Sequence, residues 1–420
     1  METSGKESSL RTYFVLWGGQ AISLLGSQLV QFALIWWLTE TTGSAVILAS
    51  ASLVGLLPQV ILGPFLGVLV DRWNRRWTMF LSDSSVMLAT MVLALLFWLD
   101  VAELWHVFVI LFIRAVAGSF HWPAMTASTS LMVPEEQLTR VQGLNQTLNG
   151  GLNIAAAPLG ALLISFMPLQ GILAIDAATA IFAIIPLLLI AIPQPVRKVG
   201  LDSAATSFMH DMKDGLAYVR GWPALMVIMG ISMLMNFLLN PAFSLLPLLV
   251  TDYFGGGAYH LSVLEVAFGV GIVVGGGVLG AWGGFRNKVA TSLSGALGFG
   301  ISILVVAFAP PHLFALAVIG MFGGGLTNSL LNGPIMAIIQ AVVAPEKQGR
   351  VFTLLGSVSS AMAPLGLMVA GPLADVFGVR GWLALAGVAM LLLGIFGYWI
   401  PPLINIEKDA AQFQGAREPA

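Results

Sequence analysis

The sequence predicts an all-α membrane protein with twelve transmembrane helices in two six-helix halves. Of its 420 residues, 58% are hydrophobic and only 9% are charged, whereas a soluble domain has about 25% charged residues. The apolar residues fall into twelve long segments, and the order of several motifs in the first half repeats in the second. Together these three observations exclude an ordinary soluble protein.

The twelve segments come first, because a hydrocarbon core of about 30 Å needs a helix of about 20 apolar residues. We expect the first six spans near residues 12–38, 45–70, 78–99, 104–127, 141–166 and 170–191. The second six are expected near residues 223–250, 260–284, 289–309, 313–341, 350–373 and 380–404. In the eighth span, the glycines at 269, 271, 275, 276, 277 and 280 predict close helix packing.

Lys and Arg placement predicts the orientation of these spans. With a cytoplasmic N-terminus, all but two of the 18 Lys and Arg residues fall in cytoplasmic segments. The exceptions are Arg114, inside a span, and Arg380, outside. We therefore expect both termini in the cytoplasm of a bacterium and the chain in its inner membrane. The net charge of −2 gives no reason to expect a nucleic-acid partner, and cysteine ligands or nucleophiles are absent because the chain has no cysteine.

The longest polar stretch divides the chain into an N-terminal half (1–195), a cytoplasmic linker (196–221) and a C-terminal half with a short tail (222–420). Within the linker, residues 206–220 place Phe208, Met212, Leu216 and Val219 on one helical face. This pattern predicts an amphipathic helix on the membrane surface. A simple tether is the main interpretation, and a regulatory site is the alternative.

The two halves repeat one design. Residues 123–125 (PAM), 134–137 (PEEQ), 140–141 (RV) and 157–160 (APLG) have counterparts at 334–336 (PIM), 345–348 (PEKQ), 350–351 (RV) and 363–366 (APLG). A parallel six-helix repeat is the construction of major facilitator transporters, whose substrate lies near the midplane between halves that rock by alternating access.

The loop after the second span resembles the cytoplasmic-loop signature of the major facilitator superfamily. It contains Gly67, Asp71, Arg72, Arg75 and Arg76. The resemblance implies a conformational latch that stabilises one state of the transport cycle. The alternative is that the basic residues only anchor the loop at the cytoplasmic surface.

Embedded charges supply the candidates for proton coupling. Arg114 lies mid-span, where it costs at least about 2.5–3.5 kcal/mol, so it should face a water-filled cavity or an acid. Residues 114–118 (RAVAG) resemble the fourth-helix motif of proton-coupled facilitators. Asp176, Glu265 and Asp83 are embedded carboxylates that can bind and release protons as access alternates. Hydrogen bonding to a neighbouring helix is the alternative for each.

Polar stripes on the first, fourth, seventh and tenth spans provide the substrate-cavity candidates, since these helices line the cavity in the facilitator fold. The candidates are Gln20, Ser23, Ser27, Gln31, His121, Asn236, Asn240, Asn328 and Asn332. Amides beside aromatic residues suit a large amphiphilic solute. The alternative is that these side chains join helices by hydrogen bonds.

The chain resembles the macrolide-efflux branch of drug-exporting facilitators. The resemblance rests on residues 17–23 (WGGQAIS), 38–45 (LTETTGSA), 67–72 (GVLVDR), 111–114 (LFIR), 133–139 (VPEEQLT) and 349–357 (GRVFTLLGS). It implies a monomeric, non-enzymatic antiporter, surrounded by membrane lipid, that exports macrolide-like or other amphiphilic drugs in exchange for protons. It implies no cofactor or metal, with the proton-motive force as energy source.

The motifs leave the cargo open. Exporters of endogenous lipids, siderophores or peptides share this scaffold, and an importer would show the same features. A membrane enzyme or sensor is a remote alternative, because the five histidines form no metal-ligand cluster in the sequence. The fifth span also departs from the usual antiporter signature, since Ala157 stands where a glycine is usual before the proline.

Overall fold

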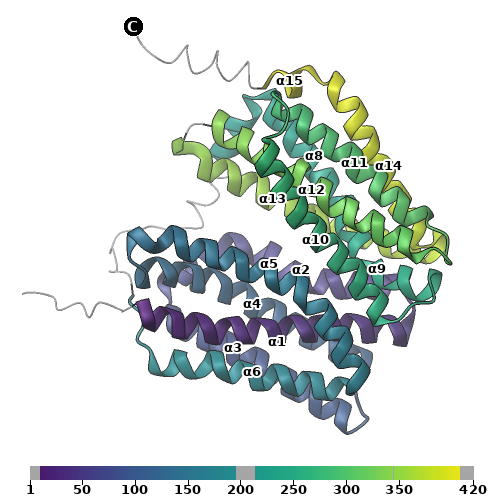
Figure 1. Cartoon of the computed structure of the whole chain (residues 1–420). Coiled ribbons are helices and arrows are strands. Elements are labelled where there is room, and N and C mark those ends of the chain that lie inside the picture. The colour runs from purple at the N-terminus through teal and green to yellow at the C-terminus, as the bar shows by residue number, and fades with distance from the viewer. Residues whose placement is uncertain (1–9, 195–212, 344, 407–420) are drawn as a thin grey trace, which may run out of the picture. The chain divides into compact units, whose positions relative to one another are not determined.

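The computed structural model describes residues 10–194, 213–343 and 345–406, and all its regular elements there are helices (Figure 1). The first six helices are long. They are α1 (Leu10–Thr42), α2 (Ala45–Arg72), α3 (Arg75–Trp98), α4 (Leu104–Met132), α5 (Glu135–Phe166) and α6 (Leu169–Leu189).

A second series of long helices follows the linker. It comprises α8 (Pro223–Ser244), α10 (Ala258–Trp282), α11 (Lys288–Phe308), α12 (Phe314–Val342), α13 (Pro345–Phe377) and α14 (Val379–Phe396). Shorter turns are α9 (Leu246–Leu248), the π-helical η1 (Leu249–Tyr253), the 3₁₀-helical η2 (Gly397–Trp399) and α15 (Pro401–Ile404).

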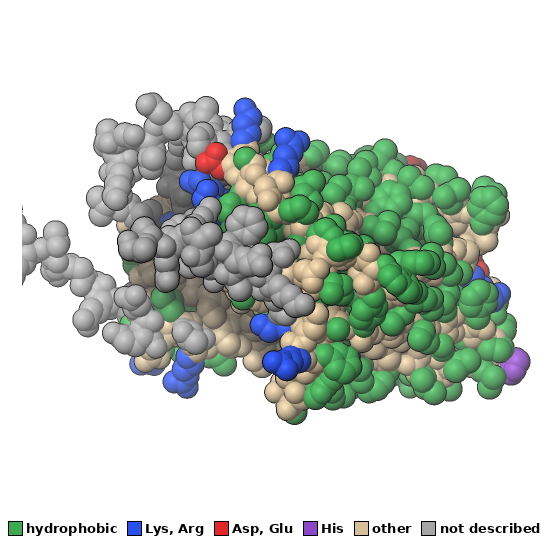
Figure 2. Space-filling view, turned by 90° about the horizontal axis from the view of Figure 1, so that it is seen from above, with side chains coloured by type: hydrophobic (Ala, Val, Ile, Leu, Met, Phe, Trp, Pro, Cys, Tyr) green, Lys and Arg blue, Asp and Glu red, His purple; other side chains and the backbone are tan. Residues whose placement is uncertain are grey.

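Twelve described helices are long and apolar enough to cross a membrane, which confirms the predicted number of spans. Their outer faces are apolar: Leu88, Phe166 and Ile319 are 63%, 78% and 64% exposed. Figure 2 shows hydrophobic side chains over most of the described part of the viewed face. Such surfaces suit hydrocarbon and not water.

The seventh span was expected near residues 223–250, and the structure has a membrane-length helix there that ends earlier. Helix α8 ends at Ser244, and the chain continues through α9 and the π-helical turn. Pro241, inside α8, and Pro247, just after it, each lack an N–H and crowd the preceding turn, which weakens regular helix hydrogen bonding in this stretch. The helix therefore changes its winding where the sequence showed only an apolar run.

The chain divides into two compact units. One comprises residues 1–41 and 51–206, and the other comprises residues 42–50 and 207–420. In the first unit, α1 lies close to α6, because a Cβ at Gly19 would meet the carbonyl of Phe182 and one at Gly26 would meet Thr179. The absence of side chains at these two positions is what allows the backbones to approach.

The second unit also packs through glycine. A Cβ at Gly271 or Gly275 of α10 would overlap the backbone of α12 at Phe322 or Leu326. This confirms the predicted close packing for those two glycines. By contrast, a Cβ at Gly276, Gly277 or Gly280 would meet nothing within 4 Å, so these three do not contribute to it.

The described part of the linker is helical from residue 213 to 220 and packs on α8 and α13 within the second unit. Val219 is fully buried in a cluster with Leu225, Ile228 and Leu354, and Leu216 covers its edge. Asp214 pairs with Arg350 of α13 at 2.9 Å. The predicted apolar face is thus present at Leu216 and Val219, while Phe208 and Met212 lie outside the described residues.

Candidate functional site

Arg114 forms a buried ion pair inside the first unit. Its Nη1 lies 2.5 Å from Oδ2 of Asp176 on α6 and also donates to Oγ1 of Thr90 on α3 at 2.7 Å. Its Nη2 donates to the backbone carbonyl of Ser27 on α1 at 3.2 Å. The hydroxyl of Ser27 donates to Oδ1 of Asp176 at 3.0 Å, and Thr90 donates to Oδ2 at 3.2 Å. The arginine therefore has the acid partner that its depth in the membrane requires.

This ion-pair network joins four helices. Asp176 is 1% exposed and Thr90 is fully buried. Because both charges are desolvated, each depends on the other and on the surrounding hydrogen bonds for compensation. The opposite charges of Asp176 and Arg114 thus balance each other, and both side chains have further hydrogen-bond partners. Their role in proton coupling stays a prediction.

Asp83 is the centre of a second polar cluster, on the same two helices α3 and α4. Its Oδ2 accepts a hydrogen bond from Nε2 of Gln20 at 2.9 Å, and its Oδ1 lies 3.3 Å from Nε2 of His121. On α3, Asp83 lies about two helical turns before Thr90. On α4, His121 lies about two helical turns after Arg114. Since α3 and α4 are antiparallel, the two clusters lie one above the other in the bundle. Sequence reasoning named Asp83 and His121 separately, and the structure brings them together.

A small pocket adjoins the second cluster. It encloses about 160 Å³ between α1, α4 and α5. Amides form much of its wall, from Gln20, Gln142, Asn145, Gln146 and Asn149, and His121 and the indoles of Trp17 and Trp122 complete its polar and aromatic lining. Nε1 of Trp17 donates to Oδ1 of Asn145 at 2.7 Å, which links the indole of α1 to the amide of α5.

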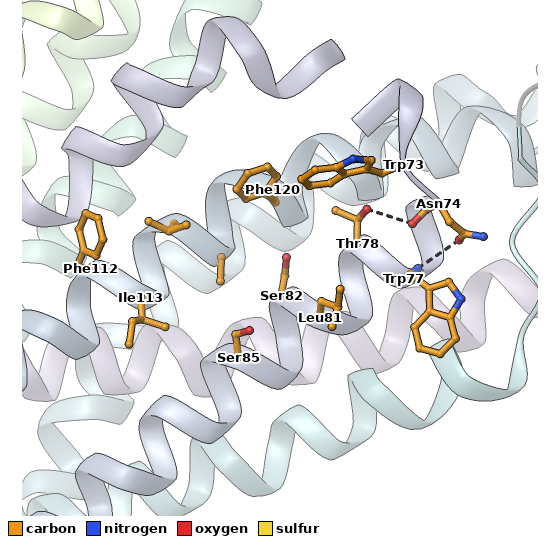
Figure 3. A pocket seen from close by; sticks show the side chains of 12 residues that line it. Trp73, Asn74, Trp77, Thr78, Leu81, Ser82, Ser85, Phe112, Ile113 and Phe120 are labelled. Atoms are coloured by element: carbon orange, nitrogen blue, oxygen red, sulfur yellow. Dashed lines mark hydrogen bonds between the residues drawn. The ribbon is translucent and has the colours of Figure 1, made fainter. Parts of the chain in front are cut away.

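A larger pocket lies between α3 and α4 and encloses about 630 Å³ (Figure 3). Trp73 stacks on Phe120, with ring centroids 5.6 Å apart, and the hydroxyls of Thr78, Ser82 and Ser85 line the α3 side. Asn74 starts α3 by accepting from the backbone N–H of Trp77 (Figure 3). This volume falls within the range of about 300–1,000 Å³ for small-molecule sites. Its aromatic and hydroxyl lining suits an amphiphilic ligand.

The substrate-cavity candidates on α1 differ in how far they are buried and in what they contact. Gln20 and Ser23 are 3% and 8% exposed, and Gln20 reaches both Asp83 and the small pocket. Ser27 is engaged with Asp176, whereas Gln31 is exposed. Contact of these residues with substrate stays a prediction.

In the second unit, the predicted asparagines form short ladders along their own helices. Asn240 Nδ2 lies 3.1 Å from Asn236 Oδ1 on α8, and Asn332 Nδ2 lies 3.3 Å from Asn328 Oδ1 on α12. Glu265 is half-buried on α10, and none of the described side chains lies within hydrogen-bonding distance of its carboxylate. Both asparagine pairs keep donors or acceptors free for a ligand.

The predicted latch can be placed only in part, because the side chains of Gly67, Asp71 and Arg72 lie outside those that the structure describes. Arg75 is 7% exposed and donates from Nη1 to the carbonyl of Ala127 on α4 at 2.9 Å. Arg76 donates to the carbonyls of Leu187 and Leu188 at the end of α6. These two arginines therefore bind the start of α3 to neighbouring helix ends, in addition to any effect on orientation.

Sequence reasoning missed Thr90 and the two glutamines of α5 that line the small pocket. Thr90 lies on the same face of α3 as Asp83, and this spacing was the available signal. Asn145 and Asn149 follow the i, i+4 pattern of a helix face, with Gln142 and Gln146 alongside. No pattern in one helix indicates which neighbour such a face contacts.

The profile described as Major Facilitator Superfamily matches residues 16–332 and 225–416. The chain belongs to the major facilitator superfamily. Membership makes it a multi-pass membrane transporter and not an enzyme. The resemblance inferred from its motifs and the twelve-helix fold class are both confirmed.

Two curated relatives are similar over nearly the whole chain. Macrolide efflux protein A of Streptococcus pyogenes is 35% identical over 393 residues, which cover 94% of this chain and 96% of the relative. Multidrug efflux pump Tap of Mycolicibacterium fortuitum is 27% identical over 404 residues, covering 91% and 94%. The crystal structure of a variant of the nucleoside transporter NupG has a TM-score of 0.71 with 13% identity, covering 91% of this chain and 98% of that one. That likeness concerns the fold alone.

Proposed function

We propose that this transporter exports macrolide-like and other amphiphilic drugs from a bacterial cell in exchange for protons, by alternating access. The observation that carries the proposal is the similarity to macrolide efflux protein A, at 35% identity over 94% of the chain. The relationship to a pump named for multidrug efflux supports a broad amphiphilic cargo.

The pockets of the first unit are consistent with such a cargo. A macrolide offers a large apolar ring, many hydroxyl and carbonyl groups, and often an amine. The larger pocket provides aromatic rings with hydroxyls, and the smaller one provides amides with indoles. Neither wall carries the cluster of charges that a small ion would require.

Proton exchange supplies enough free energy for this export. One charge crossing about 150 mV yields about 3.5 kcal/mol, which sustains a gradient of a few hundred-fold for a neutral solute. The sequence carries no Gly-rich nucleotide-binding motif ending in Gly-Lys-Ser/Thr. The proton-motive force is therefore the energy source that we assign.

The distribution of basic residues supports the location and orientation. With both termini in the cytoplasm, Arg75, Arg76, Arg140, Arg220 and Arg350 all lie on the cytoplasmic side of the bacterial inner membrane. We take the monomer as the functional unit, since each repeat of helices is present within one chain.

Accumulation of radiolabelled erythromycin in energised, efflux-deficient cells tests the proposal. Cells that express the protein should hold less label than cells with an empty vector, and a protonophore should remove the difference. Equal accumulation, with the protein shown by immunoblot to be in the membrane, would reject macrolides as cargo. A difference that survives the protonophore would reject proton coupling.

A further inference from the structure

The two side chains that contact Asp83 also line the small pocket, one from α1 and one from α4. Gln20 donates to Oδ2 at 2.9 Å, and Nε2 of His121 lies 3.3 Å from Oδ1. Both residues line the pocket, while the Asp83 side chain lies behind them and is 12% exposed. The carboxylate is therefore one side chain away from anything that occupies the pocket.

The contact between His121 and Asp83 is a loose one. Nε2 of His121 is buried and makes no hydrogen bond of good geometry with any described residue. Gln20, by contrast, holds the other carboxylate oxygen firmly. His121 can thus change its charge or rotate while Asp83 stays in position.

Among the described groups around this pocket, Asp83 is the carboxylate whose charged partner is a histidine and not an arginine or lysine. From α6, Asp176 is paired with Arg114 of α4. From α5, the side chains that line the pocket are neutral amides and Leu148. From α1, the titratable group nearby is the phenol of Tyr13, which lies 3.5 Å from Oγ1 of Thr129. In a site of low dielectric constant, a single carboxylate can compensate only a single positive charge, and a second cation would be unpaired.

We propose that Asp83 and His121 form an exchange site, in which the proton on His121 and a protonated amine of the ligand compete for the charge of Asp83. When the amine enters the pocket, His121 releases its proton to water, so that the net charge of the site is unchanged. When His121 takes up a proton again, the amine loses its counter-ion and leaves. The inference rests on the proposed function, because that function supplies an amine-bearing ligand.

The walls of the pocket favour an amine over other cations. Trp17 and Trp122 present indole rings, which attract alkylammonium groups through the ring face. The amides of α5 offer carbonyl oxygens to an N–H. The volume of about 160 Å³ is too small for a whole macrolide and suits one substituent, such as an amino sugar.

Electroneutral transport follows from this exchange. A monocationic drug carries one charge out while one proton enters, so no net charge crosses the membrane. The pH difference would then drive export of such a drug, and the membrane potential would not.

Binding of radiolabelled erythromycin to the purified full-length protein in lipid nanodiscs tests the site. Because a protonated His121 competes with the amine, the affinity should rise with pH, by up to about tenfold per pH unit on the acid side of the histidine titration. In weakly buffered solution with a pH indicator, each bound erythromycin should release one proton from the protein.

Two conservative variants separate the partners. His121→Gln should keep binding but lose both the pH dependence and the proton release. Asp83→Asn should bind at least about tenfold more weakly, because the counter-ion of the amine is gone. The matched controls are His312→Gln and Asp100→Asn, both at exposed positions outside the pocket, which should behave as wild type. Size-exclusion profiles show whether each variant is folded.

The outcomes are distinct. Proton release that persists in His121→Gln, or that disappears instead in Glu265→Gln, would overturn the exchange site while leaving drug export intact. Wild-type protein that does not bind erythromycin would overturn the proposed cargo and, with it, this inference.

Discussion

Arg114 and Asp176 are 62 residues apart in the chain, yet Nη1 of the arginine lies 2.5 Å from Oδ2 of the aspartate. The contact joins α4 to α6, and through Thr90 and Ser27 it reaches α3 and α1. One buried pair and its hydrogen-bond partners therefore connect four helices of the first unit.

This pair should show strong coupling in a double-mutant cycle. Asp176→Asn or Arg114→Gln alone leaves one buried charge uncompensated, which costs about 3–5 kcal/mol. The double variant removes both charges and should recover much of that loss. Melting temperatures in detergent measure the effect. A double variant as unstable as the sum of the two single variants would show that the charges act independently.

Arg76 should not be replaceable by lysine, although the charge is conserved. The planar guanidinium group of Arg76 donates from two nitrogens to the carbonyls of Leu187 and Leu188. The ammonium group of a lysine has one nitrogen and cannot reproduce this geometry. We expect Arg76→Lys to cost about 1–2 kcal/mol. Arg286→Lys, at an exposed position, is the control. If both variants melt as wild type does, Arg76 acts only through its charge at the membrane surface.

Val219 should anchor the linker helix far more strongly than the ion pair beside it. Val219 is fully buried, so Val219→Ala should cost about 1–3 kcal/mol. The side chains of Asp214 and Arg350 are each 40% exposed, so Asp214→Asn should cost less than about 1 kcal/mol. Thermal melting compares the two, and proteolysis of the linker provides a second readout. The opposite ranking would make the ion pair the main attachment.

Two adjacent glycines of α10 should respond to alanine with opposite signs. Alanine is favoured over glycine by about 1 kcal/mol inside a helix, so Gly276→Ala should be neutral or stabilising. Gly275→Ala places its methyl group against the backbone of Leu326 and should lower stability by about 1–3 kcal/mol or more. Yield of monodisperse protein and melting temperature measure both variants. Equal behaviour would mean that α10 and α12 do not require this close approach.

The sequence predicts the number of spans well because length and apolarity decide whether a helix crosses a bilayer. It fails at Pro247, where a change of winding depends on backbone groups and not on hydropathy. It also predicts that Arg114 needs an acid, since an isolated charge in hydrocarbon is costly.

The sequence does not indicate which acid pairs with Arg114. Asp83 is nearer in the chain, yet it contacts His121, and Asp176 takes the arginine. The choice depends on the rotation and axial shift of α3, α4 and α6, which follow from packing contacts such as Gly26 against Thr179. Because the sequence does not show how α3 and α4 are rotated, it predicted Asp83 as a proton-coupling residue and His121 as a substrate-cavity residue, without the contact between them.

The separation between Arg114 and Asp176 also has a consequence for biogenesis. During synthesis at about 5–20 residues per second, the aspartate leaves the ribosome roughly 3–12 s after the arginine. Throughout that interval α4 carries a charge that its final partner cannot yet neutralise. We expect the insertion machinery to retain α4 at its lateral gate until α6 arrives, so that the two helices enter the bilayer together.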